Sequence, residues 1–270
     1  MENRAIANCY ISPSPSTEQF IPNHTFMYLV AGSMTVYDGS KEYKLNPGDC
    51  GIGRRNHLAR YTKQMENGDF KKIYITFELE FLKEFSETYH FAVCYKKMTD
   101  TVIRLENSEL INNFIQSLMP YFNEKGVIDG DFLSIKRSEL LLVLLKTNPD
   151  LANVLFDFSS PEKIDLEKFM NTNFRFNVSI ERFAYLTGRS LSAFKRDFKV
   201  IFNLNPGYWL VQKRLEEAYY LIGKKQKKPS EIYLELGFED FSHFSFAFKK
   251  RYGVSPTKLP ATKESLILSD

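Results

Sequence analysis

The chain has 270 residues, with 36 Lys plus Arg against 33 Asp plus Glu, 43% hydrophobic residues and a formal net charge of only +3. That length fits two domains of ordinary size, and the apolar share is enough to bury a core. The composition therefore excludes a disordered chain, and 13 Gly and 11 Pro exclude a collagen-like or low-complexity one.

The cysteines indicate a reducing compartment. Cys9, Cys50 and Cys94 lie far apart, and no Cys-x-x-Cys pair suggests a disulfide framework or a structural zinc site. Residues 1–19 lack the basic and apolar regions of a signal peptide, and no stretch reaches the ~18 apolar residues of a membrane span. We expect a soluble, cytoplasmic protein with reduced, buried thiols and no membrane partner.

The N-terminal part is rich in strand signals. Residues 28–37 favour a β-strand, and Asp38-Gly39 follows at once as a hairpin turn. Residues 41–45 alternate polar and apolar side chains, residues 46–49 (Asn-Pro-Gly-Asp) form a turn, and residues 72–77 indicate another strand. Short strands separated by such turns predict an antiparallel barrel or sandwich.

The pattern then becomes helical. Residues 81–85 begin a short amphipathic stretch, and Asn107 or Ser108 could cap a longer helix whose apolar residues reach Phe122. A second apolar helix is predicted over residues 131–146. Two such helices can form an antiparallel hairpin that packs on the barrel or on a second subunit. The pattern leaves both alternatives open.

Charge divides the chain near residues 157–161, which have the composition of a linker. Residues 1–160 hold 17 basic and 20 acidic side chains, whereas residues 161–260 hold 18 basic and 11 acidic ones. An excess of that sign is attracted to a polyanion, which suggests a nucleic-acid-binding module joined to a domain of another kind.

An internal repeat with an offset of 50 residues is the strongest signal. Residues 190–206 align without a gap with residues 240–256, so that Phe194 meets Phe244 and Phe198 meets Phe248. Phenylalanines four residues apart form one apolar stripe of a helix, which places Ser190 and Asp240 at N-cap positions.

Each copy follows a short apolar segment that ends in glycine, at residues 180–188 and 230–237. Helix, glycine turn and helix is the helix-turn-helix arrangement, whose second helix enters the DNA major groove. A plain αα-hairpin has the same pattern. The duplication favours DNA binding, as do basic residues away from the phenylalanines, at Lys195, Arg196, Lys199, Lys249, Lys250 and Arg251.

Residues 206–224 join the two copies as one continuous amphipathic helix. At ~1.5 Å per residue it spans roughly 28 Å, which could hold the recognition helices near the ~34 Å separation of successive major grooves. One polypeptide would then read two adjacent grooves. The lysine-rich loop at residues 224–228 is more typical of a solvated surface than of a phosphate contact.

The residues now carry a family resemblance. Residues 206–222, with a Pro-x-x-Trp start and the Arg214-Leu215-x-x-Ala218 core, resemble the linker helix of AraC/XylS-type bacterial transcription regulators. Residues 237–256 resemble the family's C-terminal signature almost position for position. The likeness is dense over residues 160–260, and residues 28–77 resemble more weakly the cupin-like barrel that many members carry.

The resemblance implies an α+β chain of two domains. A cupin-like regulatory and dimerisation domain, an antiparallel β-barrel with a helical hairpin, is expected at 1–158. An all-α AraC-type DNA-binding domain with two helix-turn-helix units and a linker helix is expected at 159–262, before a C-terminal tail at 263–270.

The implied function is sequence-specific transcription regulation, most simply activation, with recognition helices at about 190–202 and 240–252 in successive major grooves. The implied partners are double-stranded DNA in the bacterial nucleoid, RNA polymerase, a second copy in a homodimer, and a small-molecule or protein effector of unknown identity. No catalysis, metal or cofactor is expected.

Carried over by position, the family's groove-reading residues fall on both recognition helices, at Ser192, Lys195, Arg196, Phe241, Ser242, Ser245 and Phe246. Neighbouring polar and basic residues complete the predicted DNA-binding set with Arg189, Ser190, Lys199, Lys249 and Lys250.

Phe246 departs from the family pattern, which usually has a basic residue where the repeat aligns Arg196. Arg can contact guanine in bidentate fashion, whereas Phe offers only apolar contact, for instance to a thymine methyl. We expect the first unit to dominate base readout and the second mainly to hold phosphate through Lys249 and Lys250. The signature also ends with residues 258–260 (Lys-Leu-Pro) instead of Tyr-Arg, which removes one basic contact.

A cupin-type enzyme or scaffold with an appended helical domain is the alternative. Metal-dependent cupins need a His-x-His pair, a Glu and a further His, and His24, His57, His90 and His243 are not spaced that way. No nucleotide-binding glycine loop and no activated Ser or Cys arrangement occurs.

If the barrel senses a small molecule, strand-end aromatic and basic residues could bind an anion or a sugar, and the candidates are Tyr28, Tyr43, Arg54, Arg55 and His57. Exposed tyrosines and arginines are also ordinary on a barrel surface, so the pattern selects none of them. A docking surface for a protein partner, instead of a pocket, is the alternative.

Overall fold

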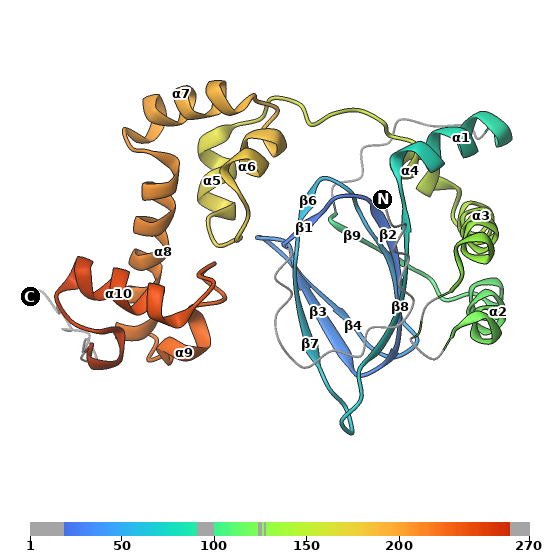
Figure 1. Cartoon of the computed structure of the whole chain (residues 1–270), viewed down its shortest axis with the longest axis horizontal. Coiled ribbons are helices and arrows are strands. Elements are labelled where there is room, and N and C mark those ends of the chain that lie inside the picture. Colours follow the sequence, from blue (N-terminus) through green and yellow to red (C-terminus); the bar gives the residue numbers. More distant parts are fainter. Residues whose placement is uncertain (1–18, 91–99, 124–125, 127, 260–270) are drawn as a thin grey trace, which may run out of the picture. The chain divides into compact units, whose positions relative to one another are not determined.

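The computed structural model describes residues 19–90, 100–123, 126 and 128–259. The chain divides into two compact units, Met1–Ser160 (unit 1) and Pro161–Asp270 (unit 2) (Figure 1). In the described ranges, no helix is long and apolar enough to cross a membrane. Cys50 is buried and free, as expected, and burial raises the pKa of its thiol to about 11. Cys9, Cys94 and the predicted tail 263–270 lie outside the described residues.

Unit 1 is built on short antiparallel strands. They are β1 (Phe20–Ile21), β2 (His24–Ala31), β3 (Ser33–Tyr37), β4 (Glu42–Leu45), β5 (Cys50–Gly53), β6 (His57–Leu58), β7 (Arg60–Gln64), β8 (Lys71–Phe77) and β9 (Val102–Leu105). Hydrogen bonds join them into three sheets with the orders β8-β2-β5-β9, β4-β3-β7 and β1-β6 (Figure 1).

The predicted β-rich stretch over residues 28–37 is confirmed, and Gly32 divides it between β2 and β3, which lie in two sheets. Gly32 has a left-handed φ of +76°, and a Cβ there would lie 2.6 Å from the carbonyl oxygen of Gln64. The predicted hairpin turn after β3 is confirmed: Asp38 Oδ1 accepts the backbone N–H groups of Ser40 and Lys41.

The two faces of β2 pack on different hydrophobic clusters. Phe26 packs with the helices of unit 1, whereas Met27 and Leu29 point to the other face and pack with Met34 and Val36 of β3. The predicted antiparallel strands are therefore present in layers. A closed cupin-like barrel is not seen, because the hydrogen bonds among the described strands leave the three sheets separate.

The helices of unit 1 are α1 (Leu79–Tyr89), α2 (Glu109–Leu118), α3 (Gly130–Thr147) and α4 (Ala152–Leu155), with the 3-10 turns η1 (Met119–Tyr121) and η2 (Pro149–Leu151). Ser108 caps α2 by accepting the N–H of Ile111, as the sequence predicts. The helix ends at Leu118, short of the predicted Phe122, because Pro120 cannot donate the next helical hydrogen bond.

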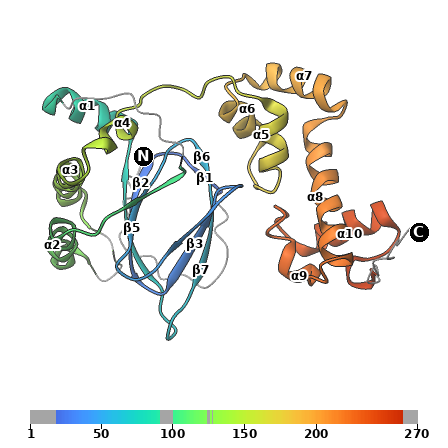
Figure 2. The ribbon, with the colours of Figure 1, turned by 180° about the vertical axis from the view of Figure 1, so that it is seen from behind.

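Over residues 161–259, unit 2 contains helices and no strand (Figure 2). It contains α5 (Leu166–Asn173), α6 (Ile180–Leu186), α7 (Leu191–Phe202), α8 (Pro206–Gly223), α9 (Pro229–Ile232), α10 (Phe241–Tyr252) and the 3-10 turn η3 (Pro256–Lys258). The predicted linker helix is confirmed as α8, with α7 at one end and α10 at the other (Figure 2).

The Arg214 side chain of α8 is buried and binds three backbone carbonyls. Its Nε donates to Phe174 O at 2.7 Å, Nη2 to Phe176 O at 2.8 Å and Nη1 to Gly237 O at 2.9 Å. Burial lowers the pKa of Arg214 to about 10, so the guanidinium stays charged at neutral pH. It joins the loop after α5 to the turn before α10.

Arg214→Ala should therefore lower the free energy of unfolding of unit 2 by about 3 kcal/mol, because three buried carbonyls lose their donors. Urea unfolding followed by the fluorescence of Trp209, the single tryptophan of the chain, measures this in unit 2. Lys213→Ala, at the preceding position of α8, is the control. Equal losses in the two variants would contradict the role given to the guanidinium.

His24 is a buried polar group of unit 1. Its Nδ1 accepts the N–H of Arg55 at 3.4 Å, and its Nε2 has no hydrogen-bond partner among the described residues. Burial and then the nearby positive charge of Arg55 lower the pKa of His24 to about 3. The imidazole is therefore neutral in the folded chain, while the unfolded chain protonates it below its ordinary pKa of about 6.5.

This difference makes unit 1 sensitive to acid. Its His24 contribution to stability is complete above about pH 6.5 and is lost as the pH falls toward 3, so that about 2 kcal/mol disappears by pH 5. His24→Asn should remove that slope, measured as the unfolding free energy from hydrogen exchange of unit 1 peptides at pH 7 and pH 5. His90→Asn is the matched control, because His90 is exposed and Asn tolerates its φ of +47°.

Candidate nucleic-acid interface

The first helix-turn-helix unit consists of α6 and α7. Gly188, with a φ of +64°, forms the turn between them, and Ser190 Oγ accepts the N–H of Ala193 at 3.3 Å. Ser190 is thus the predicted N-cap. Phe198 is fully buried and packs edge-on against Trp209 of α8, with ring centroids 5.5 Å apart. This contact fixes the recognition helix α7 on the linker helix.

The second unit repeats the recognition helix more closely than the helix before it. Asp240 Oδ1 accepts the N–H of His243 at 2.6 Å, so the predicted N-cap of α10 is confirmed. Phe244 and Phe248 are fully buried, like their counterparts in α7. The helix predicted before Gly237 is a single turn, α9, followed by non-helical turns.

The outer face of α7 carries the predicted residues Ser192, Lys195, Arg196 and Lys199, all exposed. The side chain of Arg196 is 76% exposed, and its Nη2 lies 3.3 Å from the carboxylate of Asp197. The guanidinium is therefore held at one edge, while the rest of it is free to contact a base. Ser190 is exposed at the start of the same helix.

The outer face of α10 is less basic. Ser242, Phe246, Lys249 and Lys250 are exposed. The ring of Phe246, 70% exposed, leaves a large apolar surface in contact with water. Ser245 is half-buried. Phe241 is half-buried as well, because its ring packs edge-on against Tyr233 at 5.6 Å.

Two basic residues point away from these faces. The Arg189 side chain is 8% exposed; its Nη1 donates to the carbonyls of Thr187 and Ile164, and its Nε to Asp197 at 3.2 Å. The expectation that Arg251 lies on the outer face is wrong. It donates to the backbone carbonyl of Gln212 and to Glu216 on α8, because its helical position turns it toward the linker helix.

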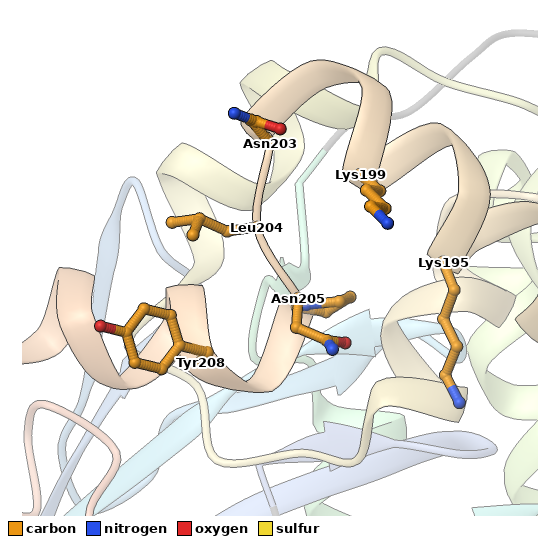
Figure 3. A pocket seen from close by; sticks show the side chains of 7 residues that line it. Lys195, Lys199, Asn203, Leu204, Asn205 and Tyr208 are labelled. Atoms are coloured by element: carbon orange, nitrogen blue, oxygen red, sulfur yellow. The ribbon is translucent and has the colours of Figure 1, made fainter.

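A hollow of about 480 Å³ lies where α7 turns into α8. Lys195 and Lys199 line it from α7, and Asn205 and Tyr208 line it at the start of α8 (Figure 3). Two ammonium groups and an amide around one hollow suit an anionic group such as a phosphate. Two of the four residues belong to the predicted set.

The sequence patterns missed Asn205, Tyr208 and Val200. Val200 is 81% exposed and lies one helical turn after Arg196 on the same face. The 50-residue repeat could have found it, because its counterpart is Lys250, but a search for polar readers passes over an apolar residue. The amphipathic pattern of the linker helix counts Tyr208 among its apolar residues, whereas the side chain is 57% exposed. Asn205 carried no signal, because the hollow depends on the angle between two helices.

The candidate effector residues of unit 1 are only partly brought together. Arg54 Nη1 donates to the carbonyl of Asp100 at 3.1 Å, and the Tyr43 hydroxyl donates to Asp38 at 2.9 Å and lies 3.5 Å from the Asp100 carboxylate. His57 Nδ1 lies 2.7 Å from the carbonyl of Arg55.

Tyr28 packs elsewhere, on the cluster beneath the helices. The polar groups of these candidates are therefore bonded within the protein, and the contacts do not define a ligand site. Over the described ranges, no group of three or more His, Cys, Asp or Glu side chains is arranged to hold a metal ion.

Two family models match the chain. Residues 24–154 match the ExsA N-terminal regulatory domain, and residues 183–261 match a helix-turn-helix domain. The second match contains α7, α8 and α10.

Known proteins are similar to the chain over more than half of its length. The HTH-type transcriptional regulator ExsA of Pseudomonas aeruginosa is 22% identical over 260 residues, 94% of this chain and 92% of that relative. The virulence regulon transcriptional activator VirF of Yersinia enterocolitica is 25% identical over 158 residues, 58% of each chain. Among solved structures, an apo ToxT variant from Vibrio cholerae gives a TM-score of 0.43 at 12% identity, covering 94% of this chain and 92% of its own.

Proposed function

Because this chain belongs to the AraC/XylS family of transcription regulators, we propose that it binds double-stranded DNA at specific sites and activates transcription there. The observation that carries the proposal is the pair of capped recognition helices, α7 and α10, at the two ends of α8. The 18 residues of α8 span about 27 Å, against the ~34 Å that separates successive major grooves. VirF is a transcriptional activator, which supports activation here, and RNA polymerase is then the expected partner.

The two recognition helices divide the work. On α7, the exposed guanidinium of Arg196 suits bidentate contact with guanine, and Ser192 lies one turn before it. On α10, Phe246 takes the position of Arg196 and offers apolar contact, while Lys249 and Lys250 bind phosphate. Base readout therefore rests mainly on the first unit.

The hollow between α7 and α8 receives a backbone phosphate. Lys195 and Lys199 supply the positive charge, Asn205 supplies an amide donor and Tyr208 a hydroxyl. Arg189 contributes indirectly, because its donors already hold the turn before α7. Of the predicted DNA-binding set, it is the residue that we place behind the interface.

Binding assays on Arg196→Ala and Phe246→Ala test this division, using a site selected from a random DNA pool and a scrambled duplex. Arg196→Ala should weaken binding to the selected site by about 1–3 kcal/mol and leave the scrambled duplex almost unchanged. Phe246→Ala should have a smaller effect on discrimination.

Lys249→Ala is the contrasting variant, because loss of a phosphate contact weakens binding to both duplexes and reduces the salt slope by about 1. If Phe246→Ala lowers discrimination more than Arg196→Ala does, the assignment of readout to α7 is wrong. If the unaltered protein selects no site, the proposed function itself fails.

We propose that residues 1–158 regulate and dimerise, and that residues 159–262 bind DNA. The match of the first part to a regulatory-domain model supports control by an effector, either a small molecule or a protein. No observation favours the alternative of a cupin-type enzyme or scaffold, so no catalytic role, metal or cofactor is proposed.

The hairpin of α2 and α3 is the proposed dimer contact. Leu110 of α2 is 52% exposed, and Phe132 and Ile135 of α3 are 51% and 68% exposed. Side chains of this size on the outer face of two packed helices suit burial against the same face of a second copy.

Ile135→Glu should therefore shift the protein from a dimer to a 31.5 kDa monomer in sedimentation experiments, because a buried carboxylate has no partner across the contact. Thr88→Glu, which adds the same side chain at an exposed position of α1, should leave the dimer intact. A dimer that survives Ile135→Glu with an unchanged dissociation constant would place the contact elsewhere.

A further inference from the structure

The connection between the two units is fastened at both ends. Residues 157–165 form no helix or strand. On the side of unit 1, Arg55 Nη2 donates to the carbonyls of Asp157 at 2.6 Å and Ser159 at 2.8 Å. Phe158 packs on the core of unit 1 and contacts Phe156, with ring centroids 6.3 Å apart. The connection therefore leaves unit 1 only after Ser159.

On the side of unit 2, residues 162–164 lie directly on the turn of the first helix-turn-helix unit. A Cβ on Gly188 would lie 2.4 Å from the carbonyl carbon of Glu162 and 2.5 Å from the backbone nitrogen of Lys163. Arg189 Nη1 donates to the carbonyl of Ile164 at 3.0 Å. Gly188 is thus needed both for its left-handed φ and for the close approach of this segment, which we call the strap.

The strap is joined to the base reader through Asp197. Asp197 Oδ2 accepts from Arg189 Nε at 3.2 Å and lies 4.0 Å from Lys163 Nζ, while Oδ1 lies 3.3 Å from Arg196 Nη2. Hydrogen bonding from Arg189, together with Arg196, holds the pKa of Asp197 below its ordinary value. One carboxylate therefore contacts the strap, the turn and the residue assigned to base readout.

We propose that the strap at residues 162–164, acting through the positioning residue Asp197, holds Arg196 in its reading geometry. Only Ser160 and Pro161 lie between the two fastened segments, and the three Cα–Cα steps from Ser159 to Glu162 span at most about 11 Å. A motion of unit 1 that needs a longer span must release either the Arg55 contacts or the strap from Gly188. Where the strap is released, unit 1 controls sequence discrimination through it. This inference rests on the proposed function, since it needs Arg196 to read bases.

Gly188→Ala and Gly253→Ala test the strap in the full chain. Both glycines have a left-handed φ, +64° and +76°, so both variants carry similar backbone strain. A Cβ on Gly253 meets nothing within 4 Å, whereas one on Gly188 meets the strap. The rate of tryptic cleavage after Lys163, whose side chain is 69% exposed, reports strap release. The ratio of dissociation constants for scrambled and selected duplexes reports discrimination.

Gly188→Ala should speed tryptic cleavage after Lys163 and lower the discrimination ratio about tenfold, while Gly253→Ala should change the ratio less than threefold. Equal ratios in the two variants, or an unchanged cleavage rate in Gly188→Ala, overturn the strap while leaving the proposed function in place. If the unaltered protein shows no discrimination, the proposed function fails and the inference with it.

If Gly188→Ala does not fold, Asp197→Asn still tests the proposal. Loss of one negative charge by itself favours binding to any DNA, so the ratio between duplexes is again the readout. The ratio should fall about fivefold, and Asp197→Glu should restore most of it. A lower melting temperature with an unchanged ratio would mean that Asp197 serves stability alone, which overturns its positioning role.

Discussion

The architecture of unit 2 depends on one buried guanidinium. Arg214 binds carbonyls rather than side chains, so it fixes the path of the main chain at the loop after α5 and at the turn before α10. The buried arginine requires a glycine in that turn, because a Cβ on Gly237 would lie 2.9 Å from the Arg214 guanidinium carbon. The relative orientation of α8 and the second recognition helix follows from this contact.

Position in the fold, more than residue type, decides what an arginine does in this unit. Arg214 is buried, Arg189 holds a turn, Arg251 binds the linker helix, and Arg196 extends outward. The N–H donors of a buried or paired guanidinium already bond within the protein, so few of them can contact DNA. The surface charge of the reading face is therefore smaller than a count of basic residues in the sequence suggests.

The features that could be predicted from the sequence are those whose cause is local. Ser108, Ser190 and Asp240 cap helices by accepting a backbone N–H three positions further along the chain. The 50-residue repeat identifies the phenylalanines that are buried in both recognition helices. The division at Gly32 and the burial of Arg189 depend on contacts with distant residues, so periodicity could not show them. The oligomeric and effector roles of unit 1 remain predictions for the same reason.

In the proposed complex with DNA, the continuous helix α8 makes the spacing of the two DNA subsites a property of the protein. A continuous α-helix keeps a fixed rise per residue, whereas one inserted base pair moves a subsite by about 3.4 Å and rotates it by about 34°. In that complex a base substitution within a subsite changes one contact at a time. An insertion between the subsites takes one recognition helix out of phase in a single step, so the spacing of the subsites is the less tolerant of the two features.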